Sequence, residues 1–417
     1  MNTKDNIKSN FQYIKYFVKW TLLAAITGVL GGVIGSLFHI CIDHATYIRE
    51  QNPFLILLLP IGGVVIALVY NIYKKHGKLD TNRIIDSVAK DENVPFILAP
   101  LIFFSATITH LLGGSAGREG AALQLGGSIG YRIGKTARLK TNDMHIAVMS
   151  GMAAVFSALF GTPLTAAFFA IEVASVGIMH YGALFPCIVS TWVAYLIAGK
   201  FGISPVRFIL GSIPSVSVAF LIKLTVISVL CALVSILFCK TIHHAEKYGK
   251  KYIPNNYIRA IIGGAIIALL TFAIGTYDYN GAGMDIIKKA ISGNVRYEAF
   301  ILKLIFTAIT IAAGFKGGEI VPCFFVGSTF GAAAASMLGI NSSFGAALGF
   351  VALFCGVTNC PVASLLLALE IFGSDAVIIF AYVCTIAYLF SGNCGLYNSQ
   401  KIVYSKLDES YINLNAN

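Results

Sequence analysis

The fold follows from two stretches of sequence, GSAGREGAALQLGGS (residues 114–128) and FKGGEIVPCFFVGS (residues 315–328). Each stretch places a glutamate in a glycine turn, Glu119 in the first and Glu319 in the second, and a Gly-Ser pair follows eight residues later. Apolar residues continue after each turn, which indicates that both turns open directly into helices.

A second pair of segments keeps nearly the same offset of about 200 residues: GTPLTAAFFAIE (residues 161–172) and NCPVASLLLALE (residues 359–370). Each has a proline near its start and a glutamate at its end. A repeat sustained over two motifs predicts two homologous halves, which we place at residues 17–200 and 201–405. Transporter repeats of this kind are often inverted in the membrane, with glycine-broken helices meeting near its middle, and we expect that arrangement here.

The composition predicts an all-α membrane protein. Hydrophobic residues make up 57% of the chain and charged residues 12%, and the mean hydropathy is +0.79, which is more apolar surface than a soluble domain of this length can bury. Between Glu319 and Glu370 there is no charged residue, and such a run is long enough to cross a bilayer. We expect tilted and partly re-entrant helices, because several apolar segments are too short to span alone.

The net charge of +11 lies in short loops beside apolar runs. Basic clusters within residues 74–83, 132–140 and 240–259 predict the cytoplasmic face by the positive-inside rule, and no nucleic-acid partner is expected. We expect a multi-pass protein of the cell membrane, in contact with lipid, whose N-terminal segment (residues 1–16) and short tail (residues 406–417) are both cytoplasmic. The nine cysteines form no CxxC pair, so neither a metal site nor a cofactor is expected.

The glycine turns have the chemistry of an anion site. A helix that begins inside the membrane has unpaired N–H groups and a positive dipole end in its first turn, and glycine lets an anion approach the backbone. The candidate anion-binding residues at the two turns are Gly117, Arg118, Gly120, Gly318 and Ile320. The alternative is that these glycines only allow close helix packing.

A carboxylate inside a membrane is costly and usually marks an ion or proton path. Glu119 beside an anion site would compete with the anion when ionised and withdraw when protonated, which predicts a gate. By contrast, we expect Glu172 and Glu370, at the ends of the symmetric helices, to bond neighbouring backbone, and Arg118 to anchor its turn.

Together these residues resemble the CLC anion channels and transporters. GSAGREGAALQLG resembles that family's glutamate-gate motif, GTPLTAAFFAIE the helix after it, and GGEIVP (residues 317–322) the second anion motif. GNCGLYNSQ (residues 392–400) is similar to the segment that supplies the central tyrosine, here Tyr397. The resemblance implies an inverted-repeat helical fold, a homodimer with a pore in each subunit, and either anion conduction or anion/proton exchange.

The departures from the family pattern narrow the choice of transported anion. Chloride-type members usually have proline where this chain has Ala121, and chloride/proton exchangers place their inner proton-transfer glutamate where it has Val173. The chloride-coordinating serine motif is replaced by GKLDTNRII (residues 77–85), in which Thr81 and Asn82 are the candidate anion contacts. The fluoride branch commonly has a methionine before the asparagine at this place.

Glu319 resembles a glutamate of the fluoride/proton antiporter branch of the family. The resemblance therefore implies fluoride export in exchange for protons, with Glu119 and Glu319 as the gating and proton-coupling residues. Phe324 and Phe325 follow the second turn, where the positive ring edges of phenylalanine suit an anion, and they are candidate pore aromatics.

Three alternatives remain open from the sequence. A chloride channel or chloride/proton exchanger of the same family fits Glu119 equally well. An intramembrane enzyme would need a nucleophile with its base or a metal set, and no HExxH motif is present. A receptor or scaffold role leaves two carboxylates at broken-helix turns unexplained.

Overall fold

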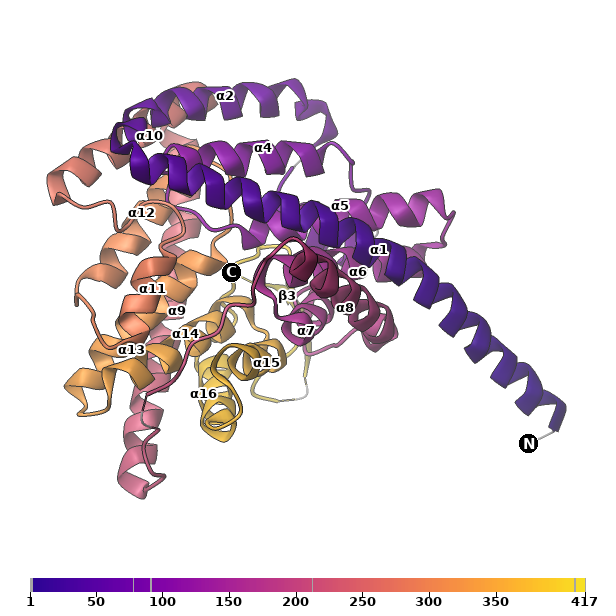
Figure 1. Cartoon of the computed structure of the whole chain (residues 1–417). Coiled ribbons are helices and arrows are strands. Elements are labelled where there is room, and N and C mark those ends of the chain that lie inside the picture. Colours follow the sequence, from indigo (N-terminus) through magenta and orange to yellow (C-terminus); the bar gives the residue numbers. More distant parts are fainter. Residues whose placement is uncertain (1–2, 78, 91, 212, 409, 417) are drawn as a thin grey trace.

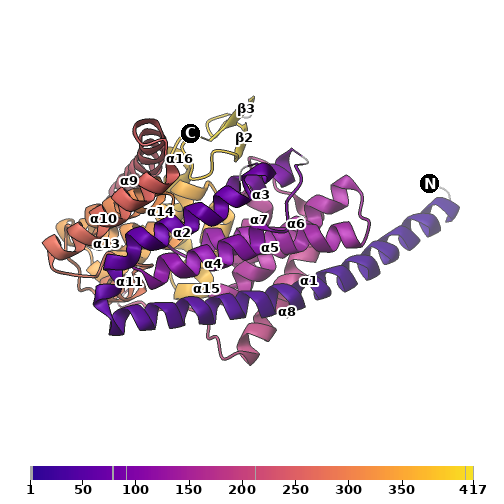
Figure 2. The same cartoon turned by 90° about the horizontal axis from the view of Figure 1, so that it is seen from above.

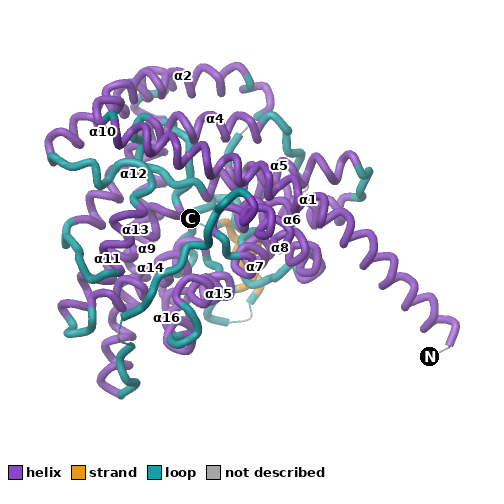
Figure 3. The backbone as a smooth tube through the Cα atoms, viewed as in Figure 1, coloured by secondary structure: helices purple, strands orange, loops and turns teal. Residues whose placement is uncertain are grey.

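The computed structural model describes residues 3–77, 79–90, 92–211, 213–408 and 410–416, with side chains from residue 12 onward. Sixteen α-helices, joined mostly by short loops, form most of this described part (Figures 1 and 3). The confirmed fold class is therefore helical, and the two glycine turns lie directly before helices, as expected.

The first half comprises α1 (Thr3–Gln51), α2 (Leu59–Ile72), α3 (Thr81–Ala89), α4 (Leu98–Leu111), α5 (Glu119–Thr136), α6 (Thr141–Phe160), α7 (Pro163–Glu172) and α8 (Leu184–Lys200). The second half comprises α9 (Val218–Tyr252), α10 (Asn256–Ile274), α11 (Met284–Ile291), α12 (Ala299–Ala313), α13 (Ile320–Met337), α14 (Ser342–Thr358), α15 (Pro361–Phe372) and α16 (Val377–Phe390). Short 3-10 turns lie at Pro53–Leu58, Lys74–His76 and Tyr181–Ala183.

Most of the helices fall into two groups by length and hydropathy. Seven helical stretches of the described residues are long and apolar enough to cross a membrane, and α1 and α9 are the longest. Six further apolar helices have only 10–17 residues and do not span a bilayer by themselves. The short group includes α7 and α15, which agrees with the expected partly re-entrant helices.

The two halves correspond helix by helix. Each half has eight helices, of which the first is the longest and the third the shortest, and α5 and α13 both have 18 residues. Helix α5 packs on α6 as α13 packs on α14, and α2 and α7 pack on their counterparts α10 and α15 (Figure 1). The repeat therefore extends to the packing of the helices.

Helices α7 and α15 show how one half is turned relative to the other. Glu172, at the end of α7, accepts hydrogen bonds from the N–H groups of Val362 (3.3 Å) and Ala363 (2.9 Å) in the first turn of α15. Glu370, near the end of α15, accepts from the N–H groups of Leu164 and Thr165 (both 2.9 Å) in the first turn of α7.

Each carboxylate thus caps the other helix, so the pair is antiparallel and related by an approximate two-fold rotation. The expectation that both glutamates bond backbone is confirmed, and the backbone is that of the opposite half.

Glycines in the helix bodies serve close packing. A Cβ on Gly151 of α6 would lie 2.8 Å from the backbone nitrogen of Gly130 of α5, and one on Gly331 of α13 would lie 2.8 Å from the Cα of Gly349 of α14. Both approaches are too close for a side chain. For these glycines, the packing alternative is therefore correct, and it holds equally in both halves.

The chain ends differ from the predicted boundaries. Helix α1 begins at Thr3, so no structural boundary occurs at residue 16, and its first part projects from the body (Figure 1). At the other end, β2 (Lys401–Tyr404) pairs antiparallel with β3 (Tyr411–Asn415) and parallel with β1 (Ser175–Val176). This small sheet, visible beside the C-terminus in Figure 2, includes residues assigned to the tail and ties them to the end of α7.

The reciprocal capping by Glu172 and Glu370 predicts that removing one of these carboxylates lowers the stability of the fold. In Glu370→Leu, the N–H groups of Leu164 and Thr165 lose their acceptor in a half-buried place, which should destabilise the fold by about 1–3 kcal/mol. The apparent melting temperature of the purified protein should fall. Glu298→Leu, which removes an exposed carboxylate, is the control and should melt like wild type; equal melting of both variants would contradict the capping role.

Candidate functional site

The two glycine turns meet through their main chains. The N–H of Gly117 donates to the carbonyl of Gly318 (2.6 Å), and the N–H of Gly318 donates back to the carbonyl of Gly117 (2.7 Å). This reciprocal pair, which we call the glycine bridge, brings the first turns of α5 and α13 together. A Cβ on Gly120 would lie 3.0 Å from the Cα of Gly318, so the approach requires glycine.

Glu119 is the first residue of α5, and its side chain is fully buried at this junction. Its Oε2 accepts hydrogen bonds from the N–H groups of Arg118 (3.0 Å) and Val321 (3.2 Å). Val321 is in the first turn of α13, so the carboxylate occupies the anion-binding end of the helix from the other half. Its other oxygen, Oε1, has no hydrogen-bond partner among the described residues.

Arg118 contributes its main chain to this site. Its guanidinium forms an ion pair with the Asp43 carboxylate of α1 (2.9 Å). The other oxygen of that carboxylate lies 2.9 Å from Nε2 of His39. The side chain is therefore held by α1, which suits a residue that anchors the turn, while its N–H reaches Glu119.

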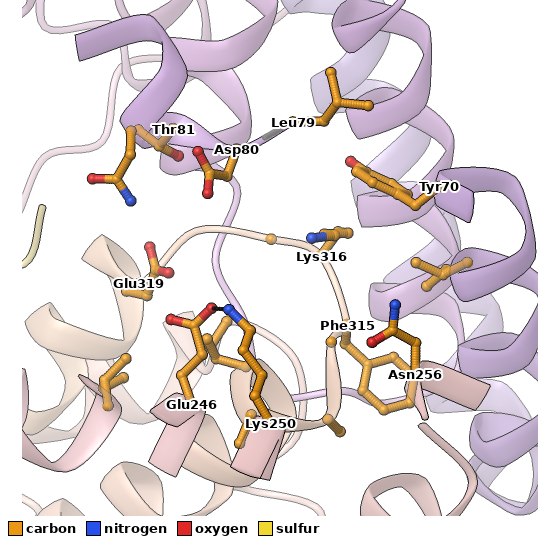
Figure 4. Close-up of a pocket in the computed structure, with 18 of the residues that line it drawn as sticks. Tyr70, Leu79, Asp80, Thr81, Glu246, Lys250, Asn256, Phe315, Lys316 and Glu319 are labelled. Carbon is orange, nitrogen blue, oxygen red and sulfur yellow. Dashed lines mark hydrogen bonds and ion pairs between the residues drawn. The ribbon is translucent and has the colours of Figure 1, made fainter. Parts of the chain in front are cut away.

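A polar cavity of about 320 Å³ lies against the second glutamate. Glu319 and three predicted site residues, Thr81, Asn82 and Tyr397, are among those that line it, and Figure 4 shows Glu319 and Thr81 beside this space. Glu319 is only half-buried, and among the described residues no other residue donates a hydrogen bond to its carboxylate. It is therefore accessible from the cavity, whereas Glu119 is enclosed.

Thr81 and Asn82 begin α3 and link it to the other parts of the site. The Thr81 hydroxyl lies 3.4 Å from the carbonyl of Gly120 and accepts from the Gln124 amide (3.0 Å), whereas Asn82 Oδ1 accepts from the N–H of Ser399 (3.1 Å). The two side chains therefore join α3 to the first glycine turn and to the segment that carries Tyr397.

The hydroxyl of Tyr397 is buried and has no partner among the described residues. Gln400, which the sequence analysis did not single out, fixes its segment: the side-chain amide donates to the carbonyls of Val173 (2.9 Å) and Thr358 (2.7 Å). Gln124, a polar residue one turn into an apolar helix, is the other missed neighbour. For Gln124 the available signal was an amide within an apolar helix, whereas Gln400 lies outside the helices and had no such signal.

A second cavity of about 370 Å³ approaches the same turns. Arg118 and Val321 line it, and neither residue lines the cavity beside Glu319. Between the two sets of lining residues lie Glu119, Gly318 and Ile320, all of them buried. The arrangement is therefore that of two cavities separated by the glycine bridge and the Glu119 carboxylate.

Comparison with known proteins agrees with this geometry. The profile of the family described as voltage gated chloride channel matches residues 61–392. The chain belongs to the CLC family. A chloride/fluoride channel protein of Pseudomonas syringae is 33% identical over 400 residues, covering 94% of this chain and 88% of that protein. An H(+)/Cl(-) exchange transporter of Vibrio campbellii is 23% identical, covering 84% of this chain and 81% of that protein.

Solved CLC structures resemble this one closely. A CLC-type fluoride/proton antiporter superposes with a TM-score of 0.89 at 31% identity, covering 92% of this chain and 98% of that one. A slow cyanobacterial chloride/proton antiporter gives 0.75 at 18% identity, covering 89% and 94%, which shows a shared fold. The predicted family and the CLC-type fold are thereby confirmed.

The predicted pore aromatics of this CLC protein lie in packed surroundings. Phe324 stacks on Phe350, with ring centroids 4.0 Å apart, and the Phe325 ring lies 5.2 Å from the ammonium of the buried Lys303. Neither ring lines the cavity beside Glu319. Among the described residues, no group of three His, Cys, Asp or Glu side chains is placed to hold a metal ion.

The glycine bridge gives a direct prediction. In Gly318→Ala, the new Cβ would lie 2.9 Å from the backbone nitrogen of Glu119 and closer still to that of Gly120, so the two turns must separate. We expect anion flux through the purified protein in vesicles to fall at least tenfold, because α13 no longer meets Glu119. Gly182→Ala is the control, since no atom lies within 4 Å of its Cβ position; normal flux in Gly318→Ala would contradict the role of the bridge.

Proposed function

We propose that this CLC protein is a fluoride/proton antiporter that exports fluoride in exchange for protons entering the cell. The observation that carries the proposal is Glu319, a second glutamate that opens into the polar cavity lined also by Tyr397 and Thr81. A simple anion conductor has no use for a titratable carboxylate there, because its negative charge opposes anion entry. A proton-coupled transporter needs such a group.

The position after Glu172 supports the same proposal. Val173 is fully buried and its carbonyl accepts from Gln400, so this place holds no group that can transfer a proton. Protons then need another route to Glu119, and Glu319 stands in the neighbouring turn. The relatives agree in kind: the Pseudomonas syringae protein carries fluoride in its name, and the antiporter of known structure is a fluoride/proton antiporter.

The proposed cycle uses the two glutamates differently. Ionised Glu119 occupies the first turn of α13 and closes the passage; once protonated, it loses its attraction for those N–H groups and leaves them to fluoride. Gly117, Gly120, Gly318 and Ile320 supply the backbone of this place. Glu319 exchanges protons with the cavity beside it.

The charged residues that line the two cavities support an orientation of the protein in the membrane. The cavity beside Glu319 is lined by Lys74, Lys250 and Arg259, from two of the basic clusters of the sequence, and we assign it to the cytoplasmic side of the cell membrane with both chain ends. The other cavity, which we propose faces outward, has one more carboxylate than it has Arg and Lys side chains: its charged lining residues are Asp43, Glu50, Asp278, Asp285, Arg49, Arg118 and Lys289. We propose that the protein is a homodimer in the lipid bilayer. Each subunit then contains two repeats, residues 17–200 and 201–405.

The anion is tested by vesicle efflux. Purified protein in liposomes loaded with sodium fluoride or sodium chloride should release fluoride at least tenfold faster than chloride, and should move protons in the opposite direction. Liposomes without protein are the control. Faster chloride efflux would instead favour a chloride channel or chloride/proton exchanger, and anion efflux with no proton movement would exclude antiport.

The two carboxylates are tested in the same vesicles. Glu119→Gln cannot ionise, so it should abolish proton movement, and Glu319→Ala should reduce coupled exchange at least tenfold because the cavity loses its proton-accepting group. Glu298→Gln, an exposed carboxylate outside both cavities, is the matched control and should exchange normally. Normal exchange in Glu319→Ala would refute the role given to the second carboxylate.

A further inference from the structure

The cavity beside Glu319 contains several cations, and most of them are already engaged. Lys250 forms an ion pair with Glu246 on the same face of α9, drawn as a dashed line in Figure 4. Arg259 donates to the carbonyl of Ile253 (3.0 Å) and to the Asn256 side chain (2.7 Å). Lys74 is exposed, so water screens its charge.

Lys316 is different. Its ammonium lies 4.4 Å from the centre of the Tyr70 ring, and no carboxylate of the described residues lies within 4.0 Å of it. A ring face stabilises a cation but does not neutralise it. The side chain is half-buried and lines the same cavity as Asp80 and Glu319 (Figure 4).

The backbone holds Lys316 in a fixed place. Its N–H donates to the Thr109 hydroxyl (3.3 Å), and the chain reaches it through Gly314, whose φ of +94° suits glycine. Two residues later the same loop forms the glycine bridge through Gly318. The ammonium is thus positioned relative to the turn that Glu119 closes.

We propose that Lys316 binds the transported anion inside this cavity, before the anion reaches the glycine bridge. The inference rests on the proposed anion transport. A small halide entering the cavity meets three carboxylates, Asp80, Glu246 and Glu319, and within the described part of the chain only Glu246 has a cationic partner. The unpaired Lys316 charge offsets that repulsion, and its ammonium donates hydrogen bonds that replace part of the water around the ion.

The test is calorimetric titration of the purified protein in detergent with sodium fluoride and with sodium chloride. Lys316→Met and Lys316→Gln should weaken binding of the preferred halide about tenfold, equivalent to about 1.4 kcal/mol. Lys316→Arg, which keeps the charge, should stay within about threefold of wild type. Lys75→Met is the matched control, since Lys75 is an exposed lysine that does not line the cavity, and it should bind normally.

Unchanged halide binding in both neutral variants overturns the inference, as does a loss that Lys316→Arg shares, because the charge would then not be what binds. Wild type that binds neither halide overturns it too. The proposed function fails separately: a wild type that binds and releases chloride in preference to fluoride, with the same dependence on Lys316, keeps this inference and refutes fluoride export.

Discussion

The reciprocal main-chain pair between Gly117 and Gly318 is the contact on which the rest of the site depends. It forms only because neither residue has a side chain, and it brings the first turns of two helices from opposite halves together. Unsatisfied N–H groups of both helices then point into one small region, which favours negative charge. Glu119 occupies that region in this structure, so the bridge also decides where this carboxylate lies.

The two glutamates have equivalent places in the sequence but different surroundings. Glu119 lies across the junction and accepts N–H groups from both turns, so its carboxylate is fully enclosed. Glu319 has the equivalent place in the sequence, but Val321 in its half is already bonded to Glu119. Two carboxylates cannot share one helix end without strong repulsion, and Glu319 instead opens into the adjoining cavity.

The sequence predicted what is encoded locally or repeated. The equal spacing after Glu119 and Glu319 gave the two helix starts, and the positions of Glu172 and Glu370 gave their bonding to backbone. The start of α1 at Thr3 was not predicted, because helix formation in a polar segment such as residues 3–16 leaves no hydropathy signal. Gln124 and Gln400 were missed because their partners are distant in the chain, and the C-terminal strands depend on a partner near residue 175.

The buried Val173 has a consequence for the route of the proton. Its carbonyl is bonded to Gln400 and its side chain is packed, so in the proposed cycle the proton does not pass through this position. Instead, the proton shares the cavity beside Glu319 with the anion. A cavity shared in this way needs a carboxylate to hold the proton. It also needs a cation to offset the repulsion between that carboxylate and the entering anion. Glu319 and Lys316, three residues apart on one fixed loop, supply that combination.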